Sequence, residues 1–336
     1  MPRQARIDVP AALHHIIIRG IERKKIFRDE EDRNNFLKRL CTVLSETSTP
    51  CYAWVLMSNH AHFLLRTGIV PIATVMKRLL TGYAQQFNRR HRRVGHLFQN
   101  RYKSILCEED PYLLELVRYI HLNPVRGGIV KKLSQLAKYR YSGHAAIMGT
   151  VTYAWQDRDY VLSHFGSKEV KARRQYLSFI ADGFSQGRRP ELSGGGLLRS
   201  YGGWGGVKEQ LRQGIRIKGD ERILGSSDFV MQVLKGANER LKQITALESM
   251  GIDIETILGK VASQYGINVE CLKSGTRIRS IVEARSVVCY AAVRHLGQSC
   301  EEVAKRLHIS PSAVCKAVSR GQNILHQKEF ERLFPI

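Results

Sequence analysis

The sequence predicts an α+β domain followed by an all-α domain, because the residue pattern changes twice along the chain. Residues 1–150 alternate short β-like runs with helical periodicity in the order βαββαβα. That order is typical of a ferredoxin-like fold, with one antiparallel sheet and helices on one face. Residues 151–245 are rich in Gly and Arg, which indicates a basic connector with some helix. Residues 246–336 show helical periodicity and no strand pattern.

Local signals justify each element of the first domain. Asp29 is a candidate N-cap for the first helix, and Ser58 and Asn59 form a tight-turn pair between two strands. Asp110 and Pro111 are expected to cap the last helix, because proline is favoured at the first helical position. The expected elements are strands over residues 13–19, 51–57, 60–66 and 102–107, and helices over residues 30–46, 70–91 and 110–123.

The composition indicates a globular protein that binds a polyanion. The 336 residues include 53 Lys and Arg against 30 Asp and Glu, a formal net charge of +23. Cations that approach phosphates release condensed counterions, so this charge favours nucleic acid. No apolar run is long enough to cross a bilayer, and there is no signal-peptide pattern, so no membrane association is expected. Seven cysteines without a C-x-x-C pair argue against a disulfide framework, and we expect a reduced, cytoplasmic protein.

Two histidines begin the strand expected over residues 60–66. His60 and His62 are two residues apart, so their side chains project side by side from one face of the sheet. Neutral imidazoles placed in this way can hold one divalent cation and leave other positions for oxygen ligands. The alternative is a pair of surface histidines beside a turn.

A tyrosine and an amide share one face at the end of the helix expected over residues 110–123. Tyr119 and Asn123 are four residues apart, and Pro124 disfavours helical conformation at the residue before it. The amide oxygen of Asn123 would then be free to approach a metal. Taken singly, Tyr119 could instead be a core or rim tyrosine and Asn123 a C-terminal cap.

These motifs together resemble a known family. The segments that carry the resemblance are residues 57–65 (MSNHAHFLL), 95–104 (GHLFQNRYKS) and 119–126 (YIHLNPVR). Over about residues 8–145, the chain is similar to the single-tyrosine HUH transposases of the insertion-sequence-200 group. The most similar branch is that of the REP-associated tyrosine transposases, which are linked to bacterial repetitive extragenic palindromes. Many relatives outside this branch carry Gln at the position of Asn123.

The resemblance implies a metal-dependent endonuclease and strand transferase that acts on single-stranded hairpin DNA. A divalent metal, Mg²⁺ or Mn²⁺, would lie on His60, His62 and Asn123. Tyr119 would attack the scissile phosphate and form a 5′-phosphotyrosine link, leaving a free 3′-OH. Tyr83 and Tyr112 are competing candidates for the nucleophile.

A basic segment follows the histidine strand. Residues 77–103 contain no acid and interleave aromatic residues among their cations, a pattern that suits backbone phosphates and unpaired bases. Arg3 and Arg6 at the N-terminus are expected to add a contact to a minor groove or to the hairpin stem. The expected DNA-binding residues of the segment are Lys77, Arg78, Arg89, Arg90, Arg92, Arg93, Arg101 and Lys103.

The last two helices follow a helix-turn-helix pattern. Ser310 and Pro311 are expected to begin the second of these helices, with Ser312, Lys316 and Arg320 facing a DNA groove. Over residues 256–325 the chain resembles the duplex-binding domain of DnaA-like replication initiators. The residues that match basic positions of that module are Arg277, Arg279 and Arg285. A helical dimerisation domain is the alternative.

Two other functions fit the same patterns. A DNA-binding regulator built on an inactive transposase fold would keep the basic surfaces without turnover. A plasmid relaxase or rolling-circle initiator would share the chemistry, but such proteins order their motifs differently and many carry two tyrosines. The chain could act as a monomer or a homodimer, and the short link from Tyr119 to Pro124 favours a site formed within one chain.

Overall fold

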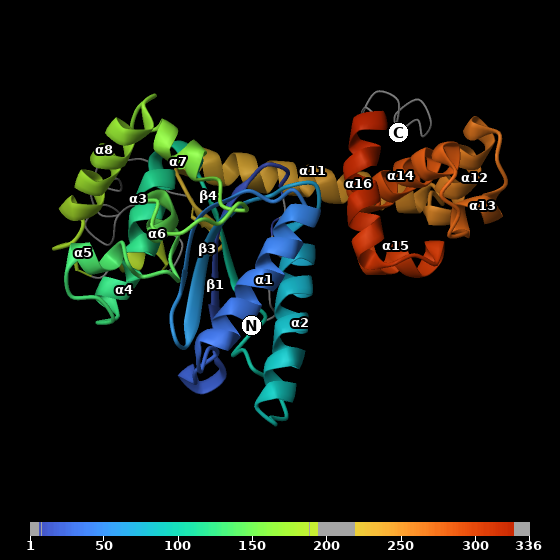
Figure 1. Cartoon of the computed structure of the whole chain (residues 1–336). Helices are drawn as coiled ribbons and strands as arrows, with labels where there is room; N and C mark the ends of the chain where they lie inside the picture. The colour runs from blue at the N-terminus through green and yellow to red at the C-terminus, as the bar shows by residue number, and fades with distance from the viewer. Residues whose placement is uncertain (1–6, 8, 188, 194–218, 326–336) are drawn as a thin grey trace. The chain divides into compact units, whose positions relative to one another are not determined.

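The computed structural model describes residues 7, 9–187, 189–193 and 219–325 (Figure 1). Two compact units divide the chain, one built largely from residues up to 234 and one largely from residues 235 onward. The expected contacts of Arg3 and Arg6, and the glycine clusters of the connector between residues 194 and 206, lie outside the described residues.

A five-stranded sheet organises the first unit. Its strands are β1 (Leu13–Arg19), β2 (Cys51–Leu56), β3 (His60–Arg66), β4 (Lys103–Cys107) and β5 (Ile223–Leu224), in the order β2-β3-β1-β4-β5. The first four strands pair antiparallel, and β5 pairs parallel with β4. The four antiparallel strands lie where the sequence predicts them, within a residue or two. Since β5 has only two residues, no periodic pattern could indicate it.

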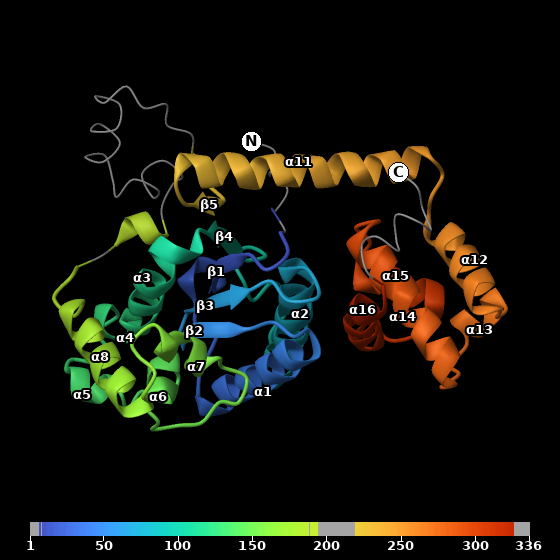
Figure 2. The ribbon, with the colours of Figure 1, turned by 90° about the horizontal axis from the view of Figure 1, so that it is seen from above.

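Helices cover both faces of this sheet. Helices α1 (Glu30–Glu46) and α2 (Ile72–Arg90) lie on one side, and α3 (Glu109–His121) lies on the other (Figure 2). The Phe36 ring of α1 stacks on Phe63 of β3, whereas Tyr119 of α3 contacts His62, the adjacent residue on β3. Neighbouring residues of a strand point to opposite faces. The expectation of helices on one face is therefore wrong, which agrees with β3 being buried almost throughout its length.

The ends of the helices follow the predicted caps with one exception. Asp29 accepts a hydrogen bond from the backbone N–H of Asp32, at 2.9 Å, and so caps α1 as expected. Helix α3 begins one residue earlier than predicted, so Asp110 lies inside its first turn instead of capping it. It ends at His121, and the short helix α4 (Asn123–Arg126) follows with Pro124 near its start.

Further helices extend the core of the first unit beyond residue 130. They are α5 (Leu133–Leu136), α6 (Gly143–Ile147), α7 (Arg158–Ser163) and α8 (Glu169–Asp182), with 3-10 turns at Ile21–Arg23 and Pro190–Leu192. The hydroxyl of Tyr176 on α8 lies 2.8 Å from Nδ1 of both His121 and His144. All three side chains are buried, so α8 packs on the helix that carries Tyr119.

The second unit is helical and contains the predicted helix-turn-helix. The helix α11 (Ser227–Ser249) leads into α12 (Ile254–Tyr265), α13 (Val269–Lys273), α14 (Arg279–Arg294), α15 (Cys300–Leu307) and α16 (Pro311–Ile324). Ser299 caps α15 in a capping box with Glu302, and His308 ends that helix in the left-handed conformation at φ 54°. Ser310 caps α16 by accepting from the N–H of Ala313, as predicted. No helix of the described residues has the length and apolar character needed to span a bilayer.

Candidate active site

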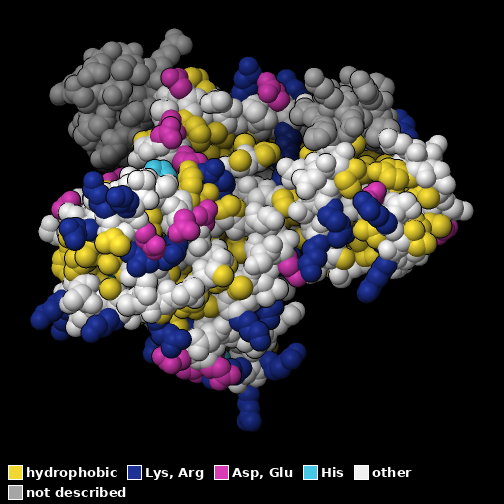
Figure 3. All heavy atoms as spheres, turned by 45° about the horizontal axis from the view of Figure 1, so that its top comes forward, with side chains coloured by type: hydrophobic (Ala, Val, Ile, Leu, Met, Phe, Trp, Pro, Cys, Tyr) yellow, Lys and Arg dark blue, Asp and Glu magenta, His cyan; other side chains and the backbone are white. Residues whose placement is uncertain are grey.

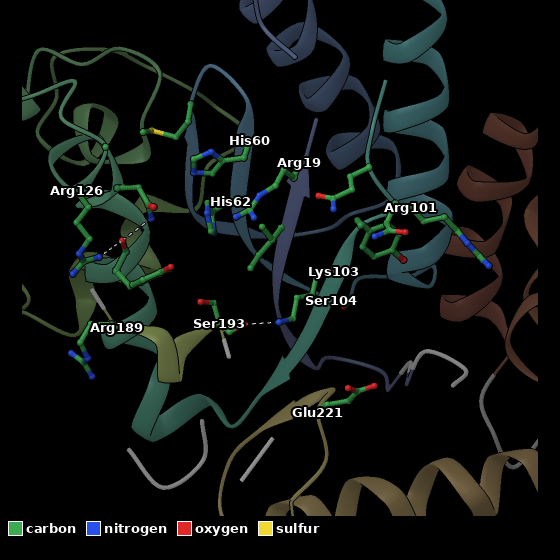
Figure 4. Close-up of a pocket in the computed structure, with 18 of the residues that line it drawn as sticks. Arg19, His60, His62, Arg101, Lys103, Ser104, Arg126, Arg189, Ser193 and Glu221 are labelled. Carbon is green, nitrogen blue, oxygen red and sulfur yellow. Dashed lines mark hydrogen bonds between the residues drawn. The ribbon is translucent and has the colours of Figure 1, made fainter. Parts of the chain in front are cut away.

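A pocket of about 1090 Å³ lies on the α3 side of the sheet, beside β1, β3 and β4 (Figure 4). Its lining includes all four residues that the sequence predicts for metal binding and nucleophilic attack: His60, His62, Tyr119 and Asn123. They come from β3, from α3 and from the first residue of α4, and they meet within one chain.

Both pocket histidines are oriented through Nδ1. The Nδ1 of His60 lies 2.7 Å from the Oδ1 of Asn59, an acceptor, so this nitrogen donates. Asn59 is fixed in turn by donating its amide N–H to the carbonyl of Arg23 at 3.0 Å. The Nδ1 of His62 lies 2.9 Å from Nε2 of His15. No described residue bonds to Nε2 of His60 or His62.

Burial keeps these rings neutral. It lowers the pKa of His60 to about 4 and the pKa of His62 well below the usual value of 6.5, because an imidazolium loses hydration there. Neighbouring positive charge at Arg19 adds to the effect on the pKa of both rings. A neutral ring offers a nitrogen lone pair, which is the form that binds a metal.

Asn123 supplies an oxygen in the same pocket. Its amide nitrogen donates to the backbone carbonyl of Tyr119 at 2.9 Å and to that of Ile120 at 3.3 Å. These bonds fix the orientation of the amide and leave Oδ1 without a donor among the described residues. Two neutral imidazoles and an amide oxygen form a donor set that fits a divalent cation. The side chains therefore fit the expected metal.

Tyr119 faces the histidines across the pocket. Its ring lies edge-on to His15 and His62, with centroid distances of 5.8 and 5.9 Å. The guanidinium of Arg126 lies 5.0 Å from the centre of the tyrosine ring, and its Nη1 donates to the Tyr119 carbonyl at 3.0 Å. The ring of Tyr119, the nucleophile predicted from the sequence, thus lies between two histidines, His15 and His62, and the guanidinium of Arg126.

The competing tyrosines lie elsewhere. Tyr83 is 1% exposed and donates its hydroxyl to the carbonyl of Ile26 within the core. Burial raises its pKa, which disfavours the phenolate. Tyr112 packs against the hydrophobic core and does not line the pocket.

Several cations line the pocket, and only two of them were expected. Arg101 and Lys103 were predicted from the basic segment, and Lys103 donates to the carbonyl of Ser193. The pocket cations that sequence reasoning missed are Arg19, Arg126, Arg189 and Arg222. Of these, Arg126 had a usable signal, since it closes the motif that begins at Tyr119 and lies seven residues after it.

Arg126 has an unused donor. Its Nε is buried without a hydrogen-bond partner among the described residues, and burial lowers its pKa from the usual 12.5. Arg189 is held differently, since its guanidinium pairs with Glu115 of α3 and with Glu191. Glu221 is the one acid among the described residues that line the pocket.

The remaining cations of the basic segment do not line the pocket. Arg90 pairs with three acids at the start of α1, Asp29, Glu31 and Asp32. Arg93 donates to the Asn88 side chain and the His96 carbonyl. The others are exposed or half-buried along α2 and the turn after it: Lys77, Arg78, Arg89 and Arg92. Figure 3 shows Lys and Arg side chains spread over the visible surface, with acids in smaller groups.

A second cluster has ligand-like spacing but is already neutralised. Asp29, Asp32 and His91 bring their ligand atoms within 4.8 Å of one another. The Arg90 guanidinium lies 2.6 Å from Asp32 and also contacts Asp29, so it takes the place that a cation would occupy. We interpret this cluster as an ion-pair network between the start of α1 and the end of α2.

The predicted DNA-binding residues of the second unit lie at its surface. Arg277 and Arg279 are exposed at the start of α14, and Arg279 pairs with Glu283 one turn later. Lys316 and Arg320 are exposed on α16, and Ser312 is half-buried in its first turn. Arg285 differs, since it is buried and donates to four backbone carbonyls: Cys271, Leu272, Ser274 and Thr276. It therefore stabilises the α13–α14 turn.

The first unit thus combines a mostly antiparallel sheet with a pocket in which a tyrosine faces a histidine pair. Residues 8–123 match the family model described as "Transposase IS200 like", and residues 254–320 match "Bacterial dnaA protein helix-turn-helix". The chain therefore carries an IS200-like tyrosine transposase domain followed by a DnaA-like helix-turn-helix domain, as the motifs had indicated.

Two individual proteins are similar to parts of the chain. The chromosomal replication initiator protein DnaA of Oleidesulfovibrio alaskensis is 34% identical over 77 residues, which is 23% of this chain. The chain spans only 17% of the length of that relative. A solved structure of a REP-associated tyrosine transposase bound to a REP hairpin has 15% identity and a TM-score of 0.36. That match covers 46% of this chain and 90% of the solved one.

Proposed function

We propose that the protein is a metal-dependent single-stranded DNA endonuclease and strand transferase that acts on hairpin DNA of the REP type. The observation that carries the proposal is the meeting of Tyr119, His60, His62 and Asn123 in one cation-lined pocket. The match of residues 8–123 to the IS200-like transposases supports it independently.

In the proposed reaction, the Oη of Tyr119 attacks the scissile phosphorus. The new O–P bond forms as the bond from phosphorus to the 3′ oxygen breaks. The phenol loses its proton, and the departing 3′ oxygen gains one, which leaves a 5′-phosphotyrosine and a free 3′-OH. When bound, Mg²⁺ or Mn²⁺ supplies Lewis acidity at the phosphate. Attack by a 3′-OH on the phosphotyrosine reverses these steps and joins strands without an energy source.

The protein's own side chains position this reaction. Neutral His60 and His62 present lone pairs at Nε2, and Asn123 would add its amide oxygen from the same pocket. Arg126 holds the Tyr119 backbone through its Nη1. Its guanidinium lines the pocket, where the positive charge would offset charge that develops in the transition state.

The proposed hairpin is held by cations on two surfaces. Arg101 and Lys103 line the pocket, and Arg89 and Arg92 are exposed on α2 and the turn after it. Such contacts bind the phosphate backbone without reading its sequence. The DnaA-like unit would bind duplex DNA through α16 and the start of α14, so that one chain holds two forms of DNA.

The decisive experiment is denaturing gel electrophoresis of the protein with labelled hairpin-bearing single-stranded DNA and Mn²⁺. We expect wild type to form a slower, protease-sensitive band. Tyr119→Phe removes the nucleophile and should form none. His62→Ala removes a proposed metal ligand and should lower the yield of the adduct at least about 100-fold. Loss of the hydrogen-bond partner of a ligand already costs about 10–100-fold in activity, and loss of the ligand itself should cost more. Tyr112→Phe is the matched control, because that ring lies on the same helix outside the pocket.

The opposite result would favour the regulator. If a panel of palindromes binds tightly to wild type and no band forms with any of them, the catalytic proposal fails. If Tyr119→Phe and His62→Ala also bind DNA as tightly as wild type, the protein would be a DNA-binding regulator without catalytic activity.

A further inference from the structure

A chain of hydrogen bonds runs from the backbone near residue 192 to the pocket histidine His62. The Nδ1 of His15 lies 3.2 Å from the carbonyl oxygen of Leu192, and its Nε2 lies 2.9 Å from Nδ1 of His62. All three residues are buried, with exposures of 1% at Leu192, 0% at His15 and 4% at His62. His15 is absent from the pocket lining, so it acts on the pocket through its neighbours.

The Leu192 carbonyl determines which atom donates in each of these hydrogen bonds. A carbonyl oxygen only accepts, so Nδ1 of His15 carries the hydrogen. In a neutral imidazole the other nitrogen then holds a lone pair, and Nε2 of His15 accepts. The hydrogen in the second bond therefore belongs to Nδ1 of His62. The lone pair of His62 is left on Nε2, the nitrogen without a partner among the described residues.

The sheet register explains why His15 can do this. His15 on β1 lies opposite Leu64 on β3, so His62 is its diagonal neighbour on the same face of the sheet. The two rings stack at a centroid distance of 5.2 Å and an interplanar angle of 26°. The ring of His15 also contacts Tyr119 edge-on. One buried side chain thus touches both a proposed ligand and the proposed nucleophile.

Contacts with α3 and β4 hold the two ends of the segment 189–193 in place. Arg189 pairs with Glu115 on the helix that carries Tyr119, and the carbonyl of Ser193 accepts from Lys103 on β4. The carbonyl of Leu192, between them, accepts from His15. These residues lie outside the segment 8–123 that matches the transposase family model.

We propose that His15 is a positioning residue that holds His62 as the Nδ1–H tautomer and aims its Nε2 at the cation, with the Leu192 carbonyl as the fixed end of the chain. The inference rests on the metal site of the proposed function. Residues 189–193 would then contribute to the metal site, because the Leu192 carbonyl determines, through His15, which nitrogen of His62 carries the hydrogen.

The test compares His15→Leu with His15→Gln and with a matched control, His14→Leu. Gln keeps one donor and one acceptor, whereas Leu keeps neither. His14 is the adjacent buried histidine and lies on the opposite face, where its Nδ1 contacts the Ser104 hydroxyl. Circular dichroism and thermal melting confirm that each full-length variant folds.

Two readouts are measured for each variant. Histidine ¹⁵N–¹H correlation spectra of the metal-free protein report which nitrogen of His62 carries hydrogen. Paramagnetic resonance of free Mn²⁺ gives the metal affinity. We expect His15→Leu to lose the pure Nδ1–H signature and to bind Mn²⁺ about 10–100-fold more weakly. His15→Gln should recover most of both, and His14→Leu should stay within about twofold of wild type.

The two proposals fail in different ways. If wild type binds Mn²⁺ no more tightly than His62→Ala, the metal site of the proposed function is wrong. If His62→Ala weakens binding but His15→Leu does not, and His62 keeps its hydrogen on Nδ1, the positioning role is overturned. An equal loss in His14→Leu would also overturn it, because general packing would then account for the effect.

Discussion

At the scale of single residues, the pocket depends on a few side chains whose chemistry is set by what they touch. Arg126 is the clearest example, since it lies against the ring of Tyr119, donates to its backbone and keeps one buried donor unpaired. In the proposed function, a cation in that position would both hold the tyrosine and stabilise the phosphate that it attacks.

We predict that Arg126→Ala slows formation of the covalent DNA adduct about 10²-fold, the usual cost of losing one charged donor at a transition state. Arg126→Lys should recover part of the rate, since it keeps the charge but loses the planar fork. The measurement is single-turnover adduct formation at saturating DNA. Arg174→Ala, which removes an exposed arginine on α8, serves as the control and should match wild type.

Buried histidines give the protein a pH-dependent stability. Burial lowers the pKa of His14 and of His144 to about 4, whereas in the unfolded chain both titrate near 6.5. The unfolded state therefore binds more protons below pH 6.5, and the free energy of unfolding falls as the pH drops toward 4. Each such histidine contributes a slope of up to about 1.4 kcal/mol per pH unit.

Denaturant unfolding followed by tryptophan fluorescence, at pH 7.5 and pH 5.5, checks this dependence. We expect a lower free energy of unfolding at pH 5.5. Equal values at the two pH values would mean that these histidines titrate normally in the folded protein.

At the scale of elements, α8 supports the helix that carries Tyr119. Tyr176 reaches from α8 to His121 on α3 and to His144 on α6, and all three side chains are buried. A single hydroxyl can donate to one ring and accept from the other, so it satisfies both Nδ1 atoms.

Replacing Tyr176 with Phe should lower the free energy of unfolding by about 1–3 kcal/mol, because it leaves buried polar nitrogens without a partner. Tyr153→Phe is the matched control. Its hydroxyl donates to the Arg140 carbonyl at an exposed position, where water can replace the bond. A Tyr176→Phe variant as stable as this control would contradict the assigned role.

The basic helix α2 contains cations with two different roles. Arg90 pairs with Asp29, Glu31 and Asp32 of α1, whereas Arg89 is exposed. We predict that Arg89→Ala weakens binding of single-stranded DNA and leaves the melting temperature unchanged. Arg90→Ala should mainly lower the melting temperature, since Asp32 is 2% exposed and would lose a partner. Fluorescence anisotropy and thermal melting separate the two effects.

At the scale of the whole molecule, one chain joins an IS200-like transposase domain to a DnaA-like helix-turn-helix domain. The chain carries a net charge of +23, and four of the predicted cations of the second unit lie at its surface: Arg277, Arg279, Lys316 and Arg320. Binding to phosphates through such residues weakens steeply with salt.

We predict that the double variant Arg277→Ala and Arg279→Ala weakens binding to duplex DNA and reduces the slope of its salt dependence by about 2, close to one per lost phosphate contact. The same variant should form the Tyr119 adduct with a short single-stranded hairpin at the wild-type rate. Loss of the adduct as well would show that the second unit takes part in catalysis.

The sequence by itself determined the features that depend on neighbouring residues. It located the four antiparallel strands, the caps at Asp29 and Ser310 and the helix-turn-helix, because periodicity and capping are local properties. It also indicated His60 with His62 and Tyr119 with Asn123, since the spacing places each pair on one face of a strand or a helix. The resemblance to the tyrosine transposases implied that the two pairs form one site. The matches to an IS200-like transposase and a DnaA-like domain agree with those motifs.

Only the tertiary structure decided the contacts between distant parts of the chain. It placed helices on both faces of the sheet, paired Arg90 with acids at the start of α1, brought Arg189 to the pocket and brought the Leu192 carbonyl to His15. It also revealed that His15, rather than the adjacent His14, reaches His62. Strand register decides which of two neighbouring histidines faces the site, and register is set by pairing between strands that are far apart in the sequence.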